Sequence, residues 1–430
     1  MKKLLYLLSF LLITSNVSAQ EITEAEQKIL DRIDANFDES VEFLKENVNI
    51  NTGTLNLEGV KVLGDKYMDV YKQIGFETNW IPQSEVKRAG HFFAEHKGTS
   101  GKKLLLIGHL DTVFEPDSPF QEYEVIDENT IAGPGIGDMK AGNVMIFYAL
   151  KAMVEAGALD DAQIIVAYTG DEEKAGSPTS ISRADLVEAA KRSDIALGFE
   201  GSSGFEYATI ARRASESWVL EVSGKQAHSS GIFREGTGAG AVYEAARIVN
   251  SFYEELQEEF LTFNVGVFLG ANNVEYDASQ LRGSVSGKTN IIPKRAVVHG
   301  DLRFLTEEQG ERTYAKMKAI VERHLPKTDA TITFNPGYPP MEPTDGNMAL
   351  LEVYSQVSQD LGLGEVKPFD PGRRGAADIS FVAKYVDGLG GLGAMGRGSH
   401  GPTEQLNLAT YKDLTKRAAL LIYRLTQENE

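Results

Sequence analysis

The run "LLLIGHLDTVF" (Leu104–Phe114) joins a buried strand to polar side chains that follow it directly. Its aliphatic residues predict a strand that ends at Gly108. His109 and Asp111 come next, and residues two apart in an extended segment point the same way. We therefore predict that His109 is a metal ligand and that Asp111 accepts the proton of its free ring nitrogen. For this pair alone, a hydrogen-bonded surface pair remains an open alternative.

Strands and helices alternate on both sides of this run. The pattern predicts strands at 103–108, 163–168 and 195–199, and helices at 57–74, 141–156 and 183–191. Thr23 and Glu26 predict a capping box that opens a helix running towards Glu46. Such alternation predicts an α/β catalytic domain, with a central, mostly parallel sheet flanked by helices.

The pattern changes near residue 212 and changes back after Pro339. Strands at 217–222, 296–304 and 330–335, with helices at 239–256 and 307–324, predict an inserted α+β domain. We therefore predict four segments: a signal peptide at 1–19, the catalytic domain at 20–211 and 327–430, and the inserted domain at 212–326.

The first residues predict export. Lys2 and Lys3 precede a short apolar run, and Val17-Ser18-Ala19 supplies small residues at a cleavage position. The mature protein is then periplasmic or secreted, with no membrane anchor.

The net charge of −19 makes nucleic acid an unfavourable partner. The chain has no cysteine, which excludes zinc–thiolate sites and a cysteine nucleophile.

Four further segments contain carboxylate or imidazole side chains that could bind a metal. They are "GPGIGDMKAG" with Asp138, "YTGDEEKAG" with Glu172 and Glu173, "GFEG" with Glu200, and "GRGSHGPTE" with His400. Each alone is equally consistent with a solvated loop or a helix cap. Together, two imidazoles and several carboxylates suit zinc, manganese or cobalt better than calcium or magnesium. Two cations sharing one carboxylate would leave a glutamate of the 172/173 pair free as a general base.

The order of these segments resembles the dinuclear M20 metallopeptidases of the glutamate carboxypeptidase (carboxypeptidase G2) type, over nearly all of the mature chain. In the inserted unit, "SGKQAHSSG" resembles the lid and dimerisation motif of that family, and "TNIIPKRAVVHGDLRF" its substrate-contacting segments. The segment "RRGAADIS" departs from the family pattern, because Ala377 stands where Ser or Thr is common and Arg373 and Arg374 stand where glycines are common.

The resemblance implies a role for each matching residue. Terminal ligands of two Zn²⁺ ions (Co²⁺ or Mn²⁺ as alternatives) would be His109, Glu173, Glu200 and His400. Asp138 would bridge the ions and precede a cis peptide bond to Met139. Asp111 would orient His109, Glu172 would be the general base, and His228 would stabilise the oxyanion in the partner subunit of a homodimer. Substrate contacts would come from Asn290, Arg303 and Gly375. A helix N-cap or loop hydrogen bond for His228 and an ion pair with Asp301 for Arg303 remain open.

The predicted function is that of an exported zinc-dependent exopeptidase or amidohydrolase. It would remove a C-terminal amino acid, with glutamate a candidate, from a small peptide or N-acyl amino acid. A deacylase of N-acyl amino acids is the alternative on the same site. A non-catalytic metal-binding relative is a third hypothesis, and it predicts the loss of Glu172 or of a ligand, yet all are present.

Overall fold

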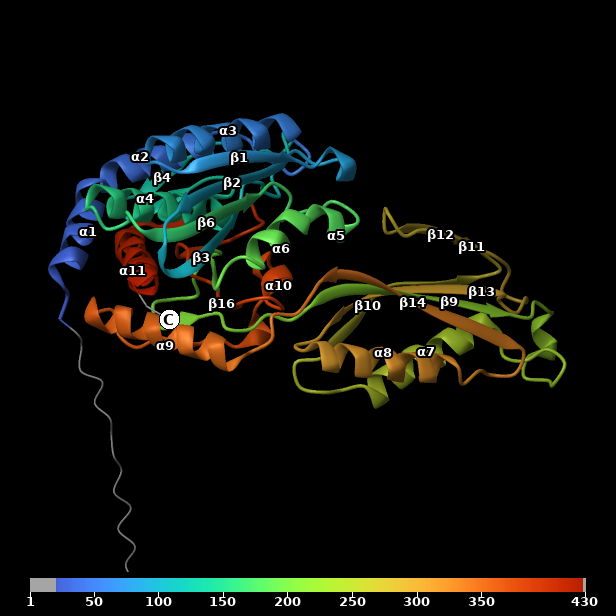
Figure 1. Ribbon diagram of the computed structural model, residues 1–430. Helices are drawn as coiled ribbons and strands as arrows, with labels where there is room; N and C mark the ends of the chain where they lie inside the picture. Colours follow the sequence, from blue (N-terminus) through green and yellow to red (C-terminus); the bar gives the residue numbers. More distant parts are fainter. Residues whose placement is uncertain (1–20, 428–430) are drawn as a thin grey trace, which may run out of the picture.

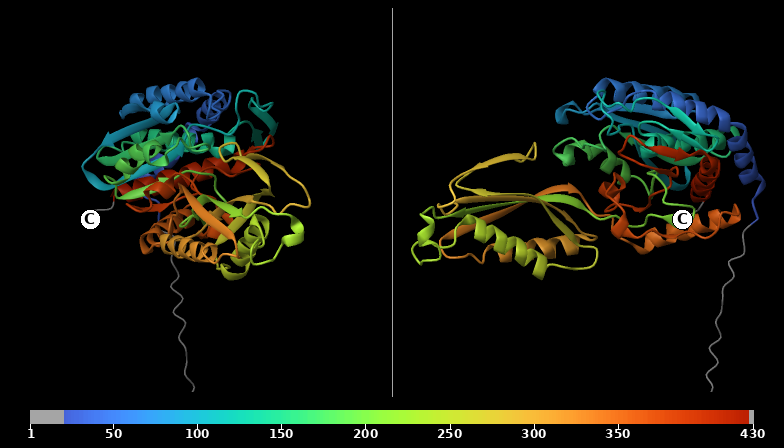
Figure 2. Two further views of the ribbon diagram at one scale, coloured as in Figure 1. Left: turned by 90° about the vertical axis from the view of Figure 1, so that its right-hand side faces the viewer. Right: turned by 180° about the vertical axis from the view of Figure 1, so that it is seen from behind.

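The computed structural model describes residues 21–427 and has two parts (Figure 1). One part is built on a six-stranded sheet and the other on a four-stranded sheet, and the second stands out to one side of the first in Figure 1 and in the right view of Figure 2. The predicted signal peptide lies outside the described residues. Within them, no helix combines the length and apolar character required to cross a bilayer.

The six-stranded sheet is mixed. Its spatial order is β1 (Glu77–Pro82), β2 (Gly90–Lys97), β6 (Ala162–Thr169), β3 (Ser100–His109), β7 (Ile195–Gly198) and β16 (Asp387–Leu389). The last four run parallel, whereas β2 pairs antiparallel with β6 and β1 antiparallel with β2. The parallel centre agrees with the predicted fold class. The sequence interpretation did not include the antiparallel pair β1 and β2.

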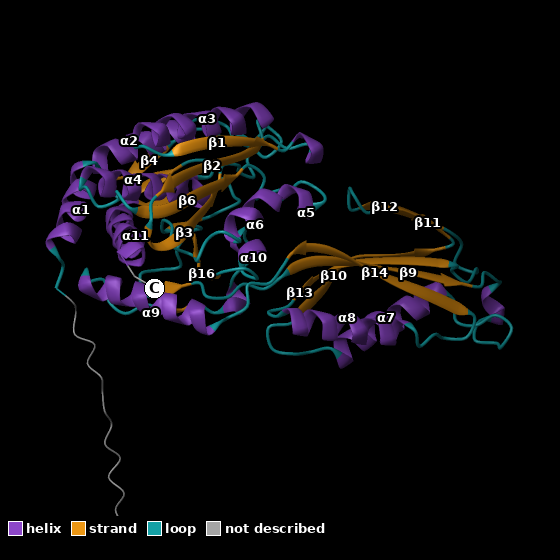
Figure 3. Ribbon diagram, viewed as in Figure 1, coloured by secondary structure: helices purple, strands orange, loops and turns teal. Residues whose placement is uncertain are grey.

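Both faces of this sheet are covered, which explains the unbroken aliphatic run in β3. Leu104 and Leu106 lie in a core with residues of α1, α2, α3, α4, α9 and α11, whereas Leu105 and Ile107 face α6 and α10 (Figure 3). The bounds are α3 Leu57–Gln73, α4 Ala141–Glu155, α6 Ala184–Ala190, α9 Asp345–Asp360, α10 Ile379–Val382 and α11 Leu408–Gln427, and the short α5 spans Thr179–Ser182. Burial on both faces holds β3 inside the sheet, and its parallel pairing with β6 and β7 places His109 at the carboxyl edge.

The N-terminal helical segment differs from the prediction of one helix up to Glu46. It forms two helices, α1 (Glu24–Ala35) and α2 (Phe37–Val48), which meet at Asn36. The predicted capping box is confirmed, because the Thr23 side chain accepts from the Glu26 amide and the Glu26 side chain accepts from the Thr23 amide.

The second part, called the lid below, is an antiparallel sheet in the order β10 (Thr262–Ala271), β13 (Arg295–Arg303), β9 (Ser215–Gly224) and β14 (Thr328–Tyr338). Helices α7 (Ala241–Glu255) and α8 (Glu307–Val321) lie along one face (Figure 1). There Trp218 and Leu220 pack against Phe252. A hairpin of β11 (Asn273–Asp277) and β12 (Arg282–Ser286) extends from β10.

The chain crosses between the two parts twice, at residues 211–214 and 338–341. These crossings are joined by an antiparallel bridge in which Arg212 and Met341 exchange both backbone hydrogen bonds, each 2.9 Å long. The predicted boundary at 326/327 is wrong, because β14 pairs with β9 from Thr328 to Tyr338 and completes the lid sheet. The strand follows α8 after a short turn, and only its pairing partner reveals to which part it belongs.

Candidate metal centre

Three groups of possible metal-ligating side chains converge at one edge of the six-stranded sheet. His109 ends β3, Glu172 and Glu173 follow β6, and Glu200 follows β7. Asp138 lies in a short helical turn before α4 (η2, Ile136–Lys140). Since β3, β6 and β7 run parallel, their carboxyl ends meet at this edge.

His400 arrives from a different element. It lies in the loop between β17 (Gly396–Arg397) and β18 (Gln405–Asn407), and β18 pairs antiparallel with β5 (Thr130–Ala132), which in turn pairs with β4 (Glu124–Asp127). This small sheet brings the His400 loop beside the turn that carries Asp138. His400 has a backbone φ of 64°, in the left-handed region that few non-glycine residues adopt.

Asp138 lies between the two histidines. Its Oδ1 is 3.3 Å from Nε2 of His109, and its Oδ2 is 3.1 Å from Nε2 of His400. On the first side, Glu200 Oε1 lies 3.5 Å from His109 Nε2. On the second, Glu173 Oε2 lies 3.1 Å from His400 Nε2. The side chains thus form two sets of one histidine and one glutamate that share Asp138. The Asp138–Met139 peptide bond is cis, as predicted.

The electrostatics of these residues fit a pair of cations. Burial raises the pKa of the Glu200 carboxyl to about 7, and the negative charge of Asp138 adds to the effect. Burial, together with the charge of Glu200, also raises the pKa of Glu172. Glu173 Oε1 is buried and has no hydrogen-bond partner. Closely packed carboxylates and a buried oxygen without a donor are the features that divalent cations stabilise.

Asp111 makes more hydrogen bonds at this edge than the one with His109 that was predicted from the sequence. His109 Nδ1 lies 3.5 Å from its carboxylate and 3.0 Å from its backbone oxygen. The same carboxylate accepts the backbone N–H groups of Glu172 at 2.9 Å and Glu173 at 3.1 Å, and the Thr54 hydroxyl at 2.6 Å. Asp111 therefore holds the ring of one candidate ligand and the backbone of two other site residues.

Asp171, the first acidic residue of the run Asp171-Glu172-Glu173, has a different environment. Asp171 is buried and accepts from the Ser182 hydroxyl, the Gly176 amide and the Arg183 guanidinium. Arg183 is 1% exposed and also donates to Asp378 at 2.7 Å. The counter-ion of Asp171 is therefore Arg183. Nothing in the local pattern around Arg183 pointed to this role.

Glu404 was also not predicted from the sequence. Its buried carboxylate accepts backbone N–H groups from Gly135 at 3.1 Å, Gly137 at 2.8 Å and Asp138 at 2.9 Å. It therefore fixes the turn that presents Asp138. The available signal was an acidic residue four positions after His400, but that spacing does not indicate which backbone it reaches.

None of the predicted substrate residues belongs to the two sets of candidate ligands. His228 and Asn290 are exposed neighbours in the lid, where the Ser229 amide donates to the Asn290 carbonyl and His228 bridges to Ile291. They lie next to the end of the lid sheet that points away from the part with the six-stranded sheet (Figure 1). Arg303 forms the alternative ion pair, 3.2 Å from Asp301. The Gly375 carbonyl accepts from Arg212 at 2.9 Å.

Two arginines beside Glu200 have no carboxylate partner among residues 21–427. Arg212 is 3% exposed, and its Nε and Nη2 atoms make no hydrogen bond. Arg374 donates to the Gly201 carbonyl, but its Nε has no partner. The charge of Arg374 helps to lower the pKa of Arg212, after burial. This edge of the site therefore carries two guanidinium groups that feel the charge of Glu200 but keep buried N–H donors without a hydrogen-bond partner.

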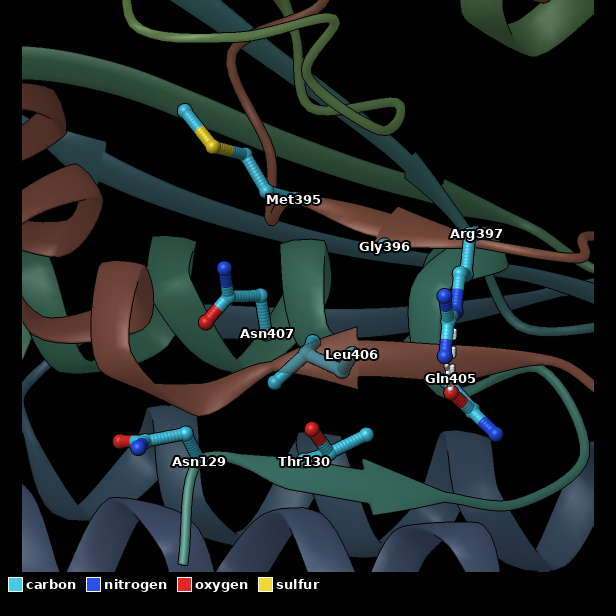
Figure 4. Close-up of a pocket in the computed structure, with 8 residues that line it drawn as sticks. All are labelled: Asn129, Thr130, Met395, Gly396, Arg397, Gln405, Leu406 and Asn407. Atoms are coloured by element: carbon cyan, nitrogen blue, oxygen red, sulfur yellow. Dashed lines mark hydrogen bonds between the residues drawn. The ribbon is translucent and has the colours of Figure 1, made fainter.

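A pocket of about 380 Å³ lies against the β17–β18 hairpin (Figure 4). Arg397 and Gln405 are hydrogen-bonded to each other at its rim. None of the candidate metal ligands lines this pocket, whose walls are Asn129, Thr130, Met395, Gly396, Arg397, Gln405, Leu406 and Asn407. We assign it no part in the metal centre.

Comparisons with known proteins agree with this geometry. Residues 105–424 match the model of peptidase family M20/M25/M40. The chain is 29% identical to carboxypeptidase G2 of Pseudomonas sp. (strain RS-16) over 340 residues, which cover 76% of this chain and 75% of that protein. It is 26% identical to succinyl-diaminopimelate desuccinylase of Gluconobacter oxydans (strain 621H) over 369 residues, 81% of this chain and 88% of that protein.

Solved structures show the same fold. A tripeptidase from Staphylococcus aureus superimposes with a TM-score of 0.71 at 18% identity, covering 95% of this chain and all of that chain. A dinuclear metal-binding peptidase from Bacillus subtilis superimposes with a TM-score of 0.64 at 14% identity, covering 92% of this chain and 99% of that chain.

Proposed function

Because this chain belongs to peptidase family M20/M25/M40, and is therefore a hydrolase of the metallo-carboxypeptidase and amidohydrolase kind, we propose that it is a zinc-dependent exopeptidase that removes a C-terminal amino acid. One observation carries this proposal: Asp138 is shared between two sets of one histidine and one glutamate. His109 with Glu200, and His400 with Glu173, are the terminal ligands in this proposal. Co²⁺ or Mn²⁺ would suit the same donor atoms.

Two such cations, when bound, supply Lewis acidity that polarises the scissile carbonyl and makes water more acidic. Glu172 is the proposed general base. It removes a proton from the attacking water and returns it to the leaving nitrogen. Asp111 supports both roles, because it orients His109 and holds the backbone amide of Glu172. All of these residues are present, which argues against a non-catalytic relative.

The substrate is proposed to be a small peptide or N-acyl amino acid that carries an acidic group, and glutamate is the leading candidate. Arg212 and Arg374 support this choice, because buried guanidinium N–H groups that have no hydrogen-bond partner in the protein favour an anionic ligand. Arg303 and Gly375 are further proposed contacts. The second candidate is a deacylase of N-acyl amino acids, which the likeness to a desuccinylase supports.

We further propose that the enzyme is exported to the periplasm or the medium, and that it is a homodimer formed through the lid. The exposed position of His228 and Asn290, at the lid end that points away from their own metal centre, supports a role in the partner's site. There His228 would donate a hydrogen bond to the oxyanion and Asn290 would contact the substrate.

Glu172→Gln tests the mechanism. The variant is expected to retain two metal ions per chain by elemental analysis, and to lose at least about 1,000-fold in kcat because no other residue takes the proton. Hydrolysis is measured on N-acylated dipeptides and N-acyl amino acids that differ in the C-terminal residue, with and without a chelator. Full activity of Glu172→Gln, or of the chelated wild type, would contradict the proposal. Equal rates on acidic and neutral C-terminal residues would contradict the preference for acidic substrates.

A further inference from the structure

The backbone of Glu172 is held on both sides by side chains. Its N–H donates to Asp111 Oδ1 at 2.9 Å, and its carbonyl accepts from the Tyr338 hydroxyl at 2.6 Å. Asp111 belongs to the catalytic part, whereas Tyr338 is the last residue of β14 in the lid. The lid thus reaches directly to the backbone of the proposed general base.

Tyr338 is itself held firmly. Arg183 Nη2 donates to the Tyr338 hydroxyl at 3.3 Å, so this oxygen accepts one hydrogen bond and donates another. The tyrosine ring packs edge-on against Phe381 with 4.8 Å between the ring centroids, and the Arg183 guanidinium lies 5.5 Å from the same Phe381 ring. Arg183 is fixed in turn by Asp171 and Asp378. The position of the hydroxyl is therefore set by a buried network and not by solvent.

Tyr338 also lies where the chain returns from the lid. Pro339 and Pro340 follow it, and Met341 then forms the backbone bridge with Arg212. Because proline fixes its own φ angle, these two residues restrict backbone rotation between the bridge and Tyr338. A change in lid orientation at this crossing would therefore act on Tyr338, and through its hydroxyl on the Glu172 carbonyl.

We propose that Tyr338 is a positioning residue that ties the general base Glu172 to the orientation of the lid. This inference rests on the proposed function, because it takes Glu172 as the base. Tyr338 acts through the backbone of Glu172. A base displaced by a fraction of an ångström from the reacting proton loses efficiency steeply, whereas substrate binding elsewhere is unaffected.

Tyr338→Phe tests the proposal in the full-length, zinc-loaded protein, because it removes the hydroxyl and keeps the ring on Phe381. With N-benzoyl-glutamate and the peptide panel as probes, kcat is expected to fall about 10- to 100-fold, while KM changes less than about threefold. Two metal ions per chain and the melting temperature are expected to remain those of the wild type. Tyr253→Phe, at a lid tyrosine that is 65% exposed, is the matched control and is expected to change nothing.

The outcomes separate the two proposals. A kcat for Tyr338→Phe within twofold of the wild type, alongside an inactive Glu172→Gln, overturns the positioning role alone. A fall in kcat accompanied by loss of metal, or by a parallel rise in KM, shows a merely structural role and also overturns it. An active Glu172→Gln, or a wild type that hydrolyses none of the probes, overturns the proposed function and this inference with it.

Discussion

Two carboxylates at the candidate metal centre each accept hydrogen bonds from several backbone amides, and one of them also contacts a candidate ligand. Asp111 accepts the amides of Glu172 and Glu173, and Glu404 accepts three amides of the turn around Asp138. A buried carboxylate that accepts several N–H groups fixes a loop more rigidly than packing alone, since each amide would otherwise be left without a partner. The positions of the ligands therefore depend on residues that bind no metal.

Glu404→Ala is expected to destabilise the protein by about 2–4 kcal/mol, because three buried backbone N–H groups lose their acceptor. Metal affinity should fall as well, since the Asp138 turn is no longer held. Urea denaturation and metal titration measure both effects. Glu404→Gln, which keeps one oxygen for Gly137 and Asp138, should lose less. An alanine variant as stable as the wild type would show that the turn holds itself.

At the scale of elements, the lid contains a half-buried acidic contact between a strand and a helix. Glu216 on β9 accepts the hydroxyl of Tyr314 on α8, and Glu307 and Glu311 of α8 face the same carboxyl. Burial raises the pKa of Glu216, an effect that the two neighbouring glutamates increase and the Tyr314 hydrogen bond opposes. The ionised form of Glu216 thus weakens the packing of α8 on the lid sheet.

This shift predicts how lid stability depends on pH. The folded protein holds the Glu216 proton more tightly than the unfolded chain, so stability falls as pH rises from the ordinary glutamate pKa through the raised one. Glu216→Gln cannot ionise, and it should gain stability relative to the wild type at pH 7 but not at pH 4. Chemical denaturation at both pH values measures the difference. Glu254→Gln on the exposed face of α7 should show no such gain, and an equal effect at both pH values for Glu216→Gln would refute the assignment.

For the whole molecule, the separation of His228 from its own metal centre predicts complementation between chains. Glu172→Gln and His228→Ala are each expected to be inactive as homodimers. A mixed dimer restores one complete site, formed by Glu172 of one chain and His228 of the other. Unfolding and refolding the two variants together should recover roughly a quarter of wild-type activity, as random pairing of two-fold symmetric dimers gives. No recovery, with dimers verified by light scattering, would contradict a shared site.

Much of the site could be predicted from the sequence because most of the candidate ligands lie at the ends of strands. His109 ends a strand, Glu172, Glu173 and Glu200 follow strands, and parallel strands bring their carboxyl ends to one edge. The order of residue types along the chain was therefore enough to predict the candidate ligands of a dinuclear centre. The boundary at 326/327 failed for the opposite reason, since β14 belongs to the lid only through its pairing with β9.

The sequence by itself determined the residue types, their order and the strand ends that carry the candidate ligands. Only the tertiary structure decided which side chains hold them in place. Glu404 reaches the Gly137 amide across 267 residues, Arg183 reaches Asp378 across 195, and Tyr338 reaches Glu172 across 166. Local periodicity reports which face of an element is buried, but the partner of a buried polar group depends on which distant segment packs against that face.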